Sequence, residues 1–243
     1  MRFEGLILSS VFLFSTLSQA SPASGQDYSY RYAFVSRVEG EVSLQRASEP
    51  EPEEGASNVP ILPGDRLWTL GGSRAEVRFA DGSALRLSEG AKVDFVDLDS
   101  ETILRVWSGS IILELSEARD SLRIDSPAGT IRPTREGSYR IDVEDGDAVT
   151  LFVPRGSAEL ANSRGTVLVQ SGETSYAALS EPPQIPVQFN TASLDDFARW
   201  SESLDREASG AREVIVRSLP HEVRTYADDL ERHGDWDYDA DYG

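Results

Sequence analysis

The last ten residues, GDWDYDADYG, place an aspartate at every second position. Carboxylates with Asp-x-Asp-x-Asp spacing open the calcium loop of an EF-hand, so Asp235, Asp237 and Asp239 are the candidate metal ligands. The loop is incomplete, because its sixth position is Ala240 where a glycine is needed and its twelfth would fall beyond Gly243. We therefore interpret the aspartates as the solvent side of an extended acidic segment. A calcium-dependent adhesion or matrix protein stays as a minor alternative.

The residues that most often carry nucleophilic or zinc chemistry are almost absent. The chain has no cysteine, and its two histidines, His221 and His233, both lie in the C-terminal tail. Ser/His and Cys/His systems need a general base beside the nucleophile, and common zinc sites need His or Cys ligands. The 42 acidic residues offer many carboxylate pairs, but no pair stands out as a glycosidase site. We therefore expect no enzyme, no catalytic residue and no cofactor.

Composition also narrows the class of partner. The chain has 243 residues, of which 39% are hydrophobic, enough for a globular core. Its 42 acidic and 23 basic residues give a formal net charge of −19. Such a field repels phosphate backbones, so we expect no nucleic-acid partner.

The N-terminus is typical of a secretory signal peptide. Arg2 precedes an apolar run from Leu6 to Leu17, and the small, polar Ser18-Gln19-Ala20 follows. We predict a signal peptide at 1–20, with cleavage between Ala20 and Ser21. The apolar run of about a dozen residues is shorter than the roughly 20 that a membrane-spanning helix needs. The sequence therefore predicts a periplasmic or secreted protein without a transmembrane anchor.

Apolar and polar residues alternate with a period of two through most of the chain, which is typical of half-buried strands. In the segment 74–87 this pattern surrounds Asp81-Gly82, which predicts a hairpin with a two-residue turn. Arg74, Arg78 and Arg86 lie on its polar face. They could form an anion site, but cross-strand ion pairs with residues such as Glu76 are the favoured interpretation.

The same alternation predicts a series of short strands beyond this hairpin. A second hairpin turns at Asp145-Gly146. The other strands are expected around 93–95, 103–107, 111–115, 122–124, 167–169 and Tyr176. Short strands separated by Gly, Asp, Ser and Pro indicate an all-β domain at about 28–180, either a sandwich or a solenoid-like roll.

Three stretches share a glycine inside a strand-like frame. They are VSRVEGEVSL at 35–44, LRVWSGSIIL at 104–113 and LFVPRGSAEL at 151–160. One interpretation is that a glycine bend serves several strands. The other is a decayed repeat that winds the chain into a solenoid-like roll.

Two segments interrupt the pattern, and a third follows it. Residues 47–58 are rich in Glu and Pro and predict a solvated loop. A proline-rich linker is expected at 181–192.

A helix is then expected over about 194–208, within a helical segment at 193–210, and an irregular acidic, aromatic tail at 211–243. Ser193 is the predicted N-cap and Gly210 the predicted stop, while Leu194, Phe197, Trp200 and Leu204 form a stripe expected to pack on the β body or a partner.

Five successive blocks in the β region resemble the FecR domain. The blocks are GGSRAEVRFADGSALRL at 71–87, LRVWSGSIILEL at 104–115, IDSPAGTIRP at 124–133, EGSYRIDV at 136–143 and LFVPRGSAEL at 151–160. The resemblance covers about 71–162 and differs at Ser138-Tyr139, where the family usually has Thr-x-Phe. The turn residues that belong to this signature are Asp81, Gly82, Gly109, Pro127, Gly129, Asp145, Gly146 and Gly156.

The resemblance implies an extracytoplasmic all-β binding module. In the best-known members of the family, this domain follows a transmembrane helix and transmits the state of an outer-membrane siderophore receptor to a cytoplasmic sigma factor. In this sequence a secretion signal stands in the place of that helix and of the sigma-binding segment. The region after the linker, with DDFARW at 195–200 and DDLERHGDW at 228–236, resembles an uncharacterised tail rich in Tyr, Gly and Trp. That pattern normally continues, so we expect the tail to be cut short at Gly243.

These observations predict an exported, non-enzymatic module that binds a protein partner in the cell envelope, for signalling or scaffolding. The alternative is a cell-envelope glycan-binding module in which tryptophans stack on sugar rings. The candidate tryptophans are Trp107, Trp200 and Trp236.

Overall fold

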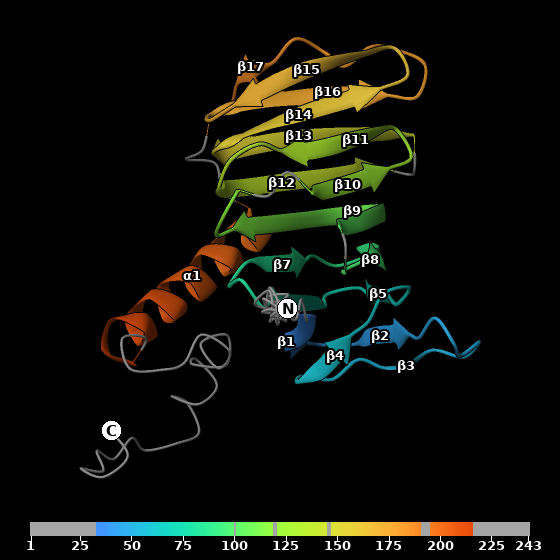
Figure 1. The fold of residues 1–243 in the computed structure, drawn as a ribbon, viewed down its shortest axis with the longest axis vertical. Coiled ribbons are helices and arrows are strands. Elements are labelled where there is room, and N and C mark those ends of the chain that lie inside the picture. Colours follow the sequence, from blue (N-terminus) through green and yellow to red (C-terminus); the bar gives the residue numbers. More distant parts are fainter. Residues whose placement is uncertain (1–32, 100, 119–120, 145–146, 191–194, 216–243) are drawn as a thin grey trace, which may run out of the picture.

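The structure, a computed structural model, describes residues 33–99, 101–118, 121–144, 147–190 and 195–215. This part of the chain folds into two β-sheets and one helix, α1 (Asp196–Ile215). The strands stack in a ladder, with β2, β3 and β4 at one end and β15, β16 and β17 at the other (Figure 1). The predicted all-β class, with short strands and one helix near the C-terminus, is confirmed.

Each sheet is a linear series of nine strands, and the long strand β9 belongs to both. Sheet A contains, in spatial order, β4 (Val59–Ile61), β1 (Ala33–Glu39), β6 (Arg74–Phe79), β7 (Ala84–Leu87), the second half of β9 (Thr102–Leu115), β12 (Gly137–Glu144), β13 (Ala148–Arg155), β16 (Glu173–Ala178) and β17 (Val187–Gln188). Sheet B contains β3 (Glu53–Glu54), β2 (Val42–Gln45), β5 (Arg66–Thr69), β8 (Lys92–Asp97), the first half of β9, β10 (Leu122–Ser126), β11 (Gly129–Pro133), β14 (Ser157–Asn162) and β15 (Gly165–Gln170). Neighbouring strands are antiparallel except for β9 and β10, which are parallel.

One hydrophobic core lies between the two sheets. Alternate residues of each strand point inward, as the period-two pattern predicts. Val77 and Ile141 of sheet A and Phe95 and Ile131 of sheet B are among the fully buried members of this single cluster. The chain has no cysteine, so it is this packing, rather than disulfide bonds, that stabilises the sandwich.

The chain crosses from one sheet to the other inside β9, at Gly109. This residue has φ +78°, a left-handed conformation that side chains rarely adopt. A Cβ at Gly109 would lie 2.5 Å from Ala91 Cα and 2.6 Å from Ala91 N, so the neighbouring backbone leaves no room for one. Glycine therefore allows a continuous strand to turn a corner and to hydrogen-bond within both sheets.

The three glycine-bearing stretches occupy equivalent places in the fold. Gly40, Gly109 and Gly156 all have positive φ angles and lie where the chain passes between the sheets. The direction of passage differs, because the chain crosses from sheet A to sheet B at Gly40 and Gly156 but from B to A at Gly109. A winding repeat would cross in one sense each time. The similarity of the three stretches is therefore explained by a shared glycine bend and not by a decayed winding repeat.

The β6–β7 hairpin forms as predicted, but its turn is longer than the expected two residues. Phe79 N bonds to Ser83 O, so three residues, Ala80, Asp81 and Gly82, make the connection. Only Gly82 has a positive φ, whereas a two-residue type I′ turn needs positive φ at both central residues. The Asp81 side chain instead accepts hydrogen bonds from the backbone N–H and hydroxyl of Ser83.

Helix α1 is longer than predicted and begins at a different cap. It continues through Gly210, the expected stop, to Ile215. At its start the Asp195 side chain accepts a hydrogen bond from the N–H of Ala198, at 2.8 Å, so Asp195 is the N-cap. The predicted cap, Ser193, and Leu194 of the predicted stripe lie outside the described residues.

The helix packs on the outer face of sheet A, as expected for its apolar stripe. Phe197, Trp200 and Leu204 form a buried cluster with Ile112 of β9. The Trp200 indole N–H donates to Glu39 of β1 at 2.8 Å. Before the helix, the proline-rich segment continues into β17, which pairs with β16. The two sheets and the helix therefore form one packed unit.

Substitution of Gly109 tests the corner. We expect Gly109→Ala to lower the free energy of unfolding by several kcal/mol, because it adds a backbone clash to the unfavourable φ. Gly72→Ala is the matched control, since Gly72 has φ +72° but nothing within 4 Å of the added Cβ. The control should lose only about 1–2 kcal/mol. Chemical denaturation measures both, and equal losses would show that the clash at Ala91 is not what requires glycine.

Candidate functional site

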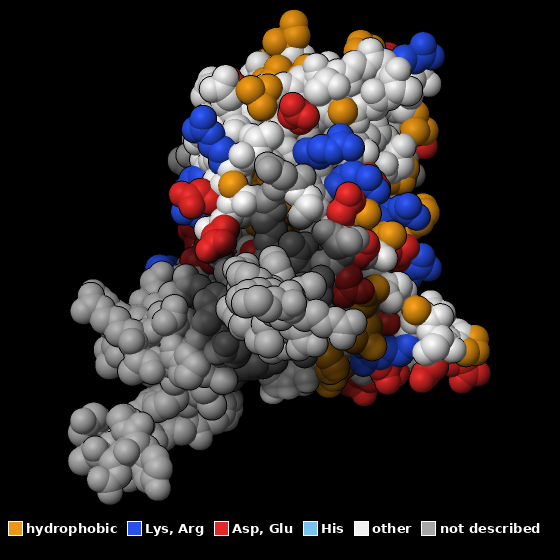
Figure 2. All heavy atoms as spheres, in the orientation of Figure 1, with side chains coloured by type: hydrophobic (Ala, Val, Ile, Leu, Met, Phe, Trp, Pro, Cys, Tyr) orange, Lys and Arg blue, Asp and Glu red, His pale blue; other side chains and the backbone are white. Residues whose placement is uncertain are grey.

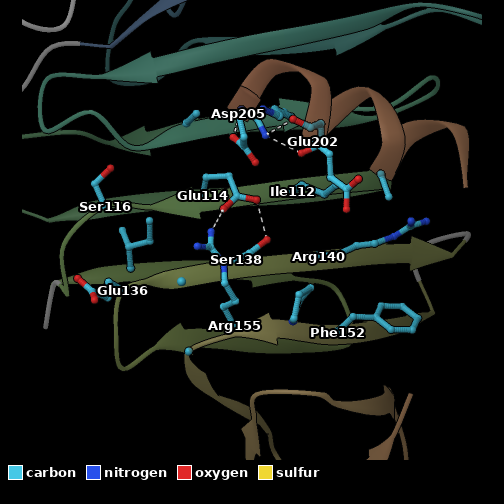
Figure 3. Close-up of a pocket in the computed structure, with 18 of the residues that line it drawn as sticks. Ile112, Glu114, Ser116, Glu136, Ser138, Arg140, Phe152, Arg155, Glu202 and Asp205 are labelled. Carbon is cyan, nitrogen blue, oxygen red and sulfur yellow. Dashed lines mark hydrogen bonds and ion pairs between the residues drawn. The ribbon is translucent and has the colours of Figure 1, made fainter. Parts of the chain in front are cut away.

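The candidate site is a groove on the outer face of sheet A, beside helix α1. It has a volume of about 1230 Å³. Strands β7, β9, β12 and β13 form its floor, and the helix contributes Glu202 and Asp205 along one side (Figure 3), together with Ser201. The opposite rim is made by the turns that carry Glu136–Gly137 and Pro154–Gly156.

Strand register places the polar floor residues in one row. Ala84 lies opposite Glu114, Glu114 opposite Ser138, and Ser138 opposite Arg155. The row crosses four strands that are far apart in sequence, and its side chains project away from the core between the sheets. In Figure 3, Glu114 and Ser138 point toward each other across the floor.

Glu114 is the most enclosed carboxylate of the groove, with 17% of its side chain exposed. The Ser138 hydroxyl donates to its Oε1 at 2.6 Å, and Arg155 donates to its Oε2 at 2.9 Å. Burial raises the pKa of the Glu114 carboxyl, and nearby Asp205 raises it further. The Ser138 hydrogen bond and the charges of Arg86 and Arg155 oppose this shift without cancelling it. Glu114 is therefore the groove residue best placed to gain a proton on mild acidification.

Arg86, at the helix side of the groove, is the most deeply buried charged residue that lines it. Only 2% of its side chain is exposed. Its Nε donates to Glu76 at 3.0 Å, and its Nη1 donates to the hydroxyl of Ser201 at 2.6 Å and to that residue's carbonyl at 2.9 Å. Its Nη2 donates to Asp205 at 2.6 Å. One guanidinium thus bonds to β6 and to α1.

Glu76 completes this buried network from below. The Ser36 hydroxyl donates to its carboxylate at 2.7 Å, and Arg78 donates to it at 3.0 Å. Burial alone would raise the pKa of Glu76, but the charges of Arg78 and Arg86 outweigh that effect and the pKa is lowered. Glu76 is therefore ionised at neutral pH, and the network consists of paired charges.

A second arginine, Arg140 of β12, links the sheet to the start of the helix. It donates to Asp142 at 2.9 Å and pairs with Asp195 at 2.6 Å. Its guanidinium also lies 5.8 Å from the ring centre of Phe152 and 6.0 Å from that of Phe197. These contacts hold the helix N-terminus on the sheet and give the groove an aromatic side.

Tyr139, the position where the sequence differs from the family pattern, stabilises the rim of the groove opposite the helix. Its ring is buried in the core, and its hydroxyl lies 2.6 Å from the carbonyl of Arg135 and 3.1 Å from that of Ser157. Ser157 N–H also donates to this hydroxyl at 3.3 Å. The hydroxyl therefore ties the turn before β12 to the turn after β13, a link that phenylalanine could not make.

The groove offers hydrogen-bond donors, carboxylates and one aromatic wall. In the described ranges, no group of three or more His, Cys, Asp or Glu residues could hold a metal ion. Within those same ranges, no helix is long and apolar enough to cross a membrane. The arrangement is suited to binding a ligand that is partly polar and partly apolar, with Arg155 and Arg140 available to its acceptors.

The predicted turn residues fall into three groups. Gly82 and Gly156 line the groove, and Asp81 belongs to the β6–β7 turn beside it. Gly109 lies at the β9 corner, Pro127 lies in the β10–β11 turn, and Gly129 is the first residue of β11. The remaining predicted positions lie outside the described residues: Ala20, Ser21, Asp145, Gly146, Asp235, Asp237 and Asp239.

Ion pairing, the favoured interpretation of the three hairpin arginines, is found for two of them. Arg86 pairs across the hairpin, whereas Arg78 pairs with a residue of its own strand. Arg78 and Arg86 pair with Glu76, and Arg74 lies 5.7 Å from the ring centre of Trp200. The role of Arg86 in binding the helix was not predicted. Its partners Ser201 and Asp205 are 115 and 119 residues away in sequence, and no local pattern connects them.

The candidate tryptophans have different surroundings. Trp200, a residue of the helix, is buried between the helix and sheet A, and Trp236 lies outside the described residues. Trp107 is partly exposed on the outer face of sheet B, where its indole N–H donates to Asp94 at 2.8 Å. Arg66 and Arg105 lie 6.0 and 5.6 Å from its ring centre. A sugar that stacked on Trp107 would compete with these arginines for the ring.

Comparison with known families identifies the domain that holds the groove floor. Residues 65–159 match the family model described as FecR protein. The chain therefore contains a FecR domain, as the sequence blocks predicted. The matched residues run from the start of β5 into β14 and include the floor strands β7, β9, β12 and β13. Helix α1 lies outside the match.

Two crystal structures similar to this chain are of a candidate anti-sigma factor from Parabacteroides distasonis ATCC 8503. Their sequence identities to this chain are 10% and 12%, and the TM-scores are 0.44 and 0.43. The matched region covers 57% of this chain and 64% and 63% of theirs, so this chain spans less than two thirds of their length. No curated protein matches the chain.

Removal of the buried arginine tests the network. We expect Arg86→Met to lower the free energy of unfolding by about 3–5 kcal/mol, because buried Glu76 would lose one of its two arginine partners and the bonds to Ser201 and Asp205 would also be lost. Arg123→Met is the control, since Arg123 pairs with Asp125 on the sheet surface at 3.2 Å. An exposed pair of that kind contributes about 1 kcal/mol or less. Chemical denaturation gives both values, and similar losses would contradict a structural role for Arg86.

The opposite pKa shifts of Glu114 and Glu76 predict opposite pH effects. A raised pKa stabilises the fold at acidic pH, and this contribution is lost as pH rises through the folded-state pKa. Glu114→Gln should therefore become more stable relative to wild type as pH rises from acid to neutral. Glu76, whose pKa is lowered, stabilises above its ordinary pKa, so Glu76→Gln should become less stable over the same range. Melting temperatures across pH test this, and a change in the same direction for both variants would refute it.

Proposed function

We propose that this protein is an exported, non-enzymatic regulatory module of the cell envelope that binds another protein in the groove of sheet A. The observation that carries the proposal is the composition of the groove. Its floor belongs to the FecR domain, and its helical wall lies outside that domain. A segment added outside the domain thus gives the FecR strands a defined concave surface.

The groove chemistry suits an extended polypeptide segment. Arg155, with 70% of its side chain exposed, offers donors to backbone carbonyls or carboxylates. Phe152 and Phe189 contact each other edge to face, with ring centres 5.4 Å apart, and form an apolar end for a side chain of the partner. A concave surface with an apolar part and a few oriented polar groups is typical of ligand-binding sites in general.

The signalling part of the proposal rests on the FecR domain, since the resemblance implies a module that passes information between proteins. The predicted signal peptide at 1–20 supports an envelope location. A protein of this kind would relay or scaffold through contacts outside the cytoplasm. We assign no chemical reaction to the groove.

Site-specific photo-cross-linking in living cells tests the proposal. A photoreactive residue replaces Arg155 in the groove or, as the control, Arg132, which is exposed on the outer face of sheet B. We expect a discrete adduct with another protein from position 155 only, in the periplasmic or secreted fraction. Adducts of the same size from both positions, or none from 155 while a known envelope complex cross-links in the same cells, would contradict it.

A further inference from the structure

The two sheets end in four edge strands, and three of them carry features that discourage pairing with another strand. Edge strand β3 consists of two exposed glutamates, and β4 has Pro60 at its centre. Edge strand β17 has two residues and follows the proline-rich segment 181–186. Short strands, charges and prolines are the usual means by which proteins protect a sheet edge.

The fourth edge strand, β15, has none of these features. Its six residues, GTVLVQ, include no charge and no proline. Among the described residues, β15 pairs with β14 alone. It is therefore the one edge in the described part of the sandwich that can accept a further strand.

The backbone groups of β15 that face outward can be assigned. Gln170 N–H bonds to the side chain of Glu173 at 2.9 Å, so this N–H is directed away from β14. Alternate residues of an antiparallel strand direct their N–H and C=O groups to opposite edges. Leu168 and Thr166 therefore direct their backbone N–H and C=O groups to the free edge. These two residues can form backbone hydrogen bonds with a further strand.

Apolar side chains gather at the same end of the sandwich. Eight large hydrophobic residues are exposed in the described part of the chain, and four of them lie here: Leu168, Leu179, Ile185 and Val187. Ile185 is 83% exposed and Leu168 is 50% exposed. Figure 2 shows hydrophobic side chains at this end, which Figure 1 identifies as the β15–β17 end. Exposed apolar residues beside an open strand edge indicate a surface that is covered in the functional state.

We propose that this end is a dimer interface, in which β15 pairs antiparallel with β15 of a second copy and joins the two B sheets. This inference goes beyond the proposed function, because it concerns a surface away from the groove. Leu168 lies on the two-fold axis and faces its own counterpart. Thr166 then faces Gln170, and Val167 faces Val169 on the core side.

The properties of β15 favour a second copy as the occupant. In this register no charge meets a like charge, and the core-facing valines of each copy extend the other's core. The register also brings exposed Arg164 of each copy near the turn before the other copy's Glu173, which gives a pair of complementary contacts. A two-fold axis requires this kind of self-complementary surface.

Measurement of mass in solution tests the dimer directly. We expect the purified protein to have twice the mass of one chain by sedimentation equilibrium at micromolar concentrations, and Leu168→Arg to have the mass of one chain with an unchanged circular dichroism spectrum. Because each copy carries a net charge of −19 and the strand itself is uncharged, added salt should strengthen the association. A wild-type protein of single-chain mass at all salt concentrations, or a Leu168→Arg variant that dimerises equally well, would overturn the proposal.

A thiol cross-link defines the register. The chain has no cysteine, so Leu168→Cys introduces a single thiol that faces its counterpart across the proposed axis. Leu62→Cys is the matched control, since Leu62 is 53% exposed but lies at the opposite end of the sandwich. With a short bifunctional thiol reagent, we expect Leu168→Cys to form a covalent dimer at least tenfold faster than Leu62→Cys. Equal rates would overturn the β15 interface, even if the protein is dimeric.

Discussion

The candidate site depends on the buried guanidinium of Arg86. A charge with 2% exposure is tolerated only when its donors are matched, and here the partners come from β6 and from two positions on α1. If the helix moved away, Arg86 would lose Asp205 and Ser201, and Ile112 would lose the apolar side chains of Phe197, Trp200 and Leu204 that cover it. The energetic cost of that state holds the helix on sheet A, and the position of the helix defines one wall of the groove.

The opposite side of the groove is held in place by the strand crossings between the sheets and by one hydroxyl group, that of Tyr139. The strands cross between the sheets near this rim, and Tyr139 ties two of the crossings together through Arg135 and Ser157. The floor between the two walls then follows from strand register, which places Glu114, Ser138 and Arg155 in a row. A rigid floor and two anchored walls give a preorganised surface, which reduces the entropy lost on binding.

Much of this fold can be predicted from local patterns, because each strand buries alternate residues and each hairpin needs specific turn residues. The strands around Val77, Ile141 and Val169 follow directly from that alternation. The order of the FecR blocks adds the identity of the domain. Local patterns do not contain the contact between Arg86 and Asp205, which joins residues 119 positions apart. They also predicted a helix stop at Gly210, although one glycine costs only about 1 kcal/mol inside a helix.

Hydrogen exchange of the α1 amides tests most directly whether the helix is an integral wall of the site. If Arg86 and the Ile112 cluster hold the helix on sheet A, the amides of its first three turns should exchange only through the opening that also exposes β7 and β9. We expect matching protection in these elements, and a parallel loss of protection in the helix when Asp205 is replaced by alanine. Rapid exchange along α1 while β7 and β9 stay protected would contradict it.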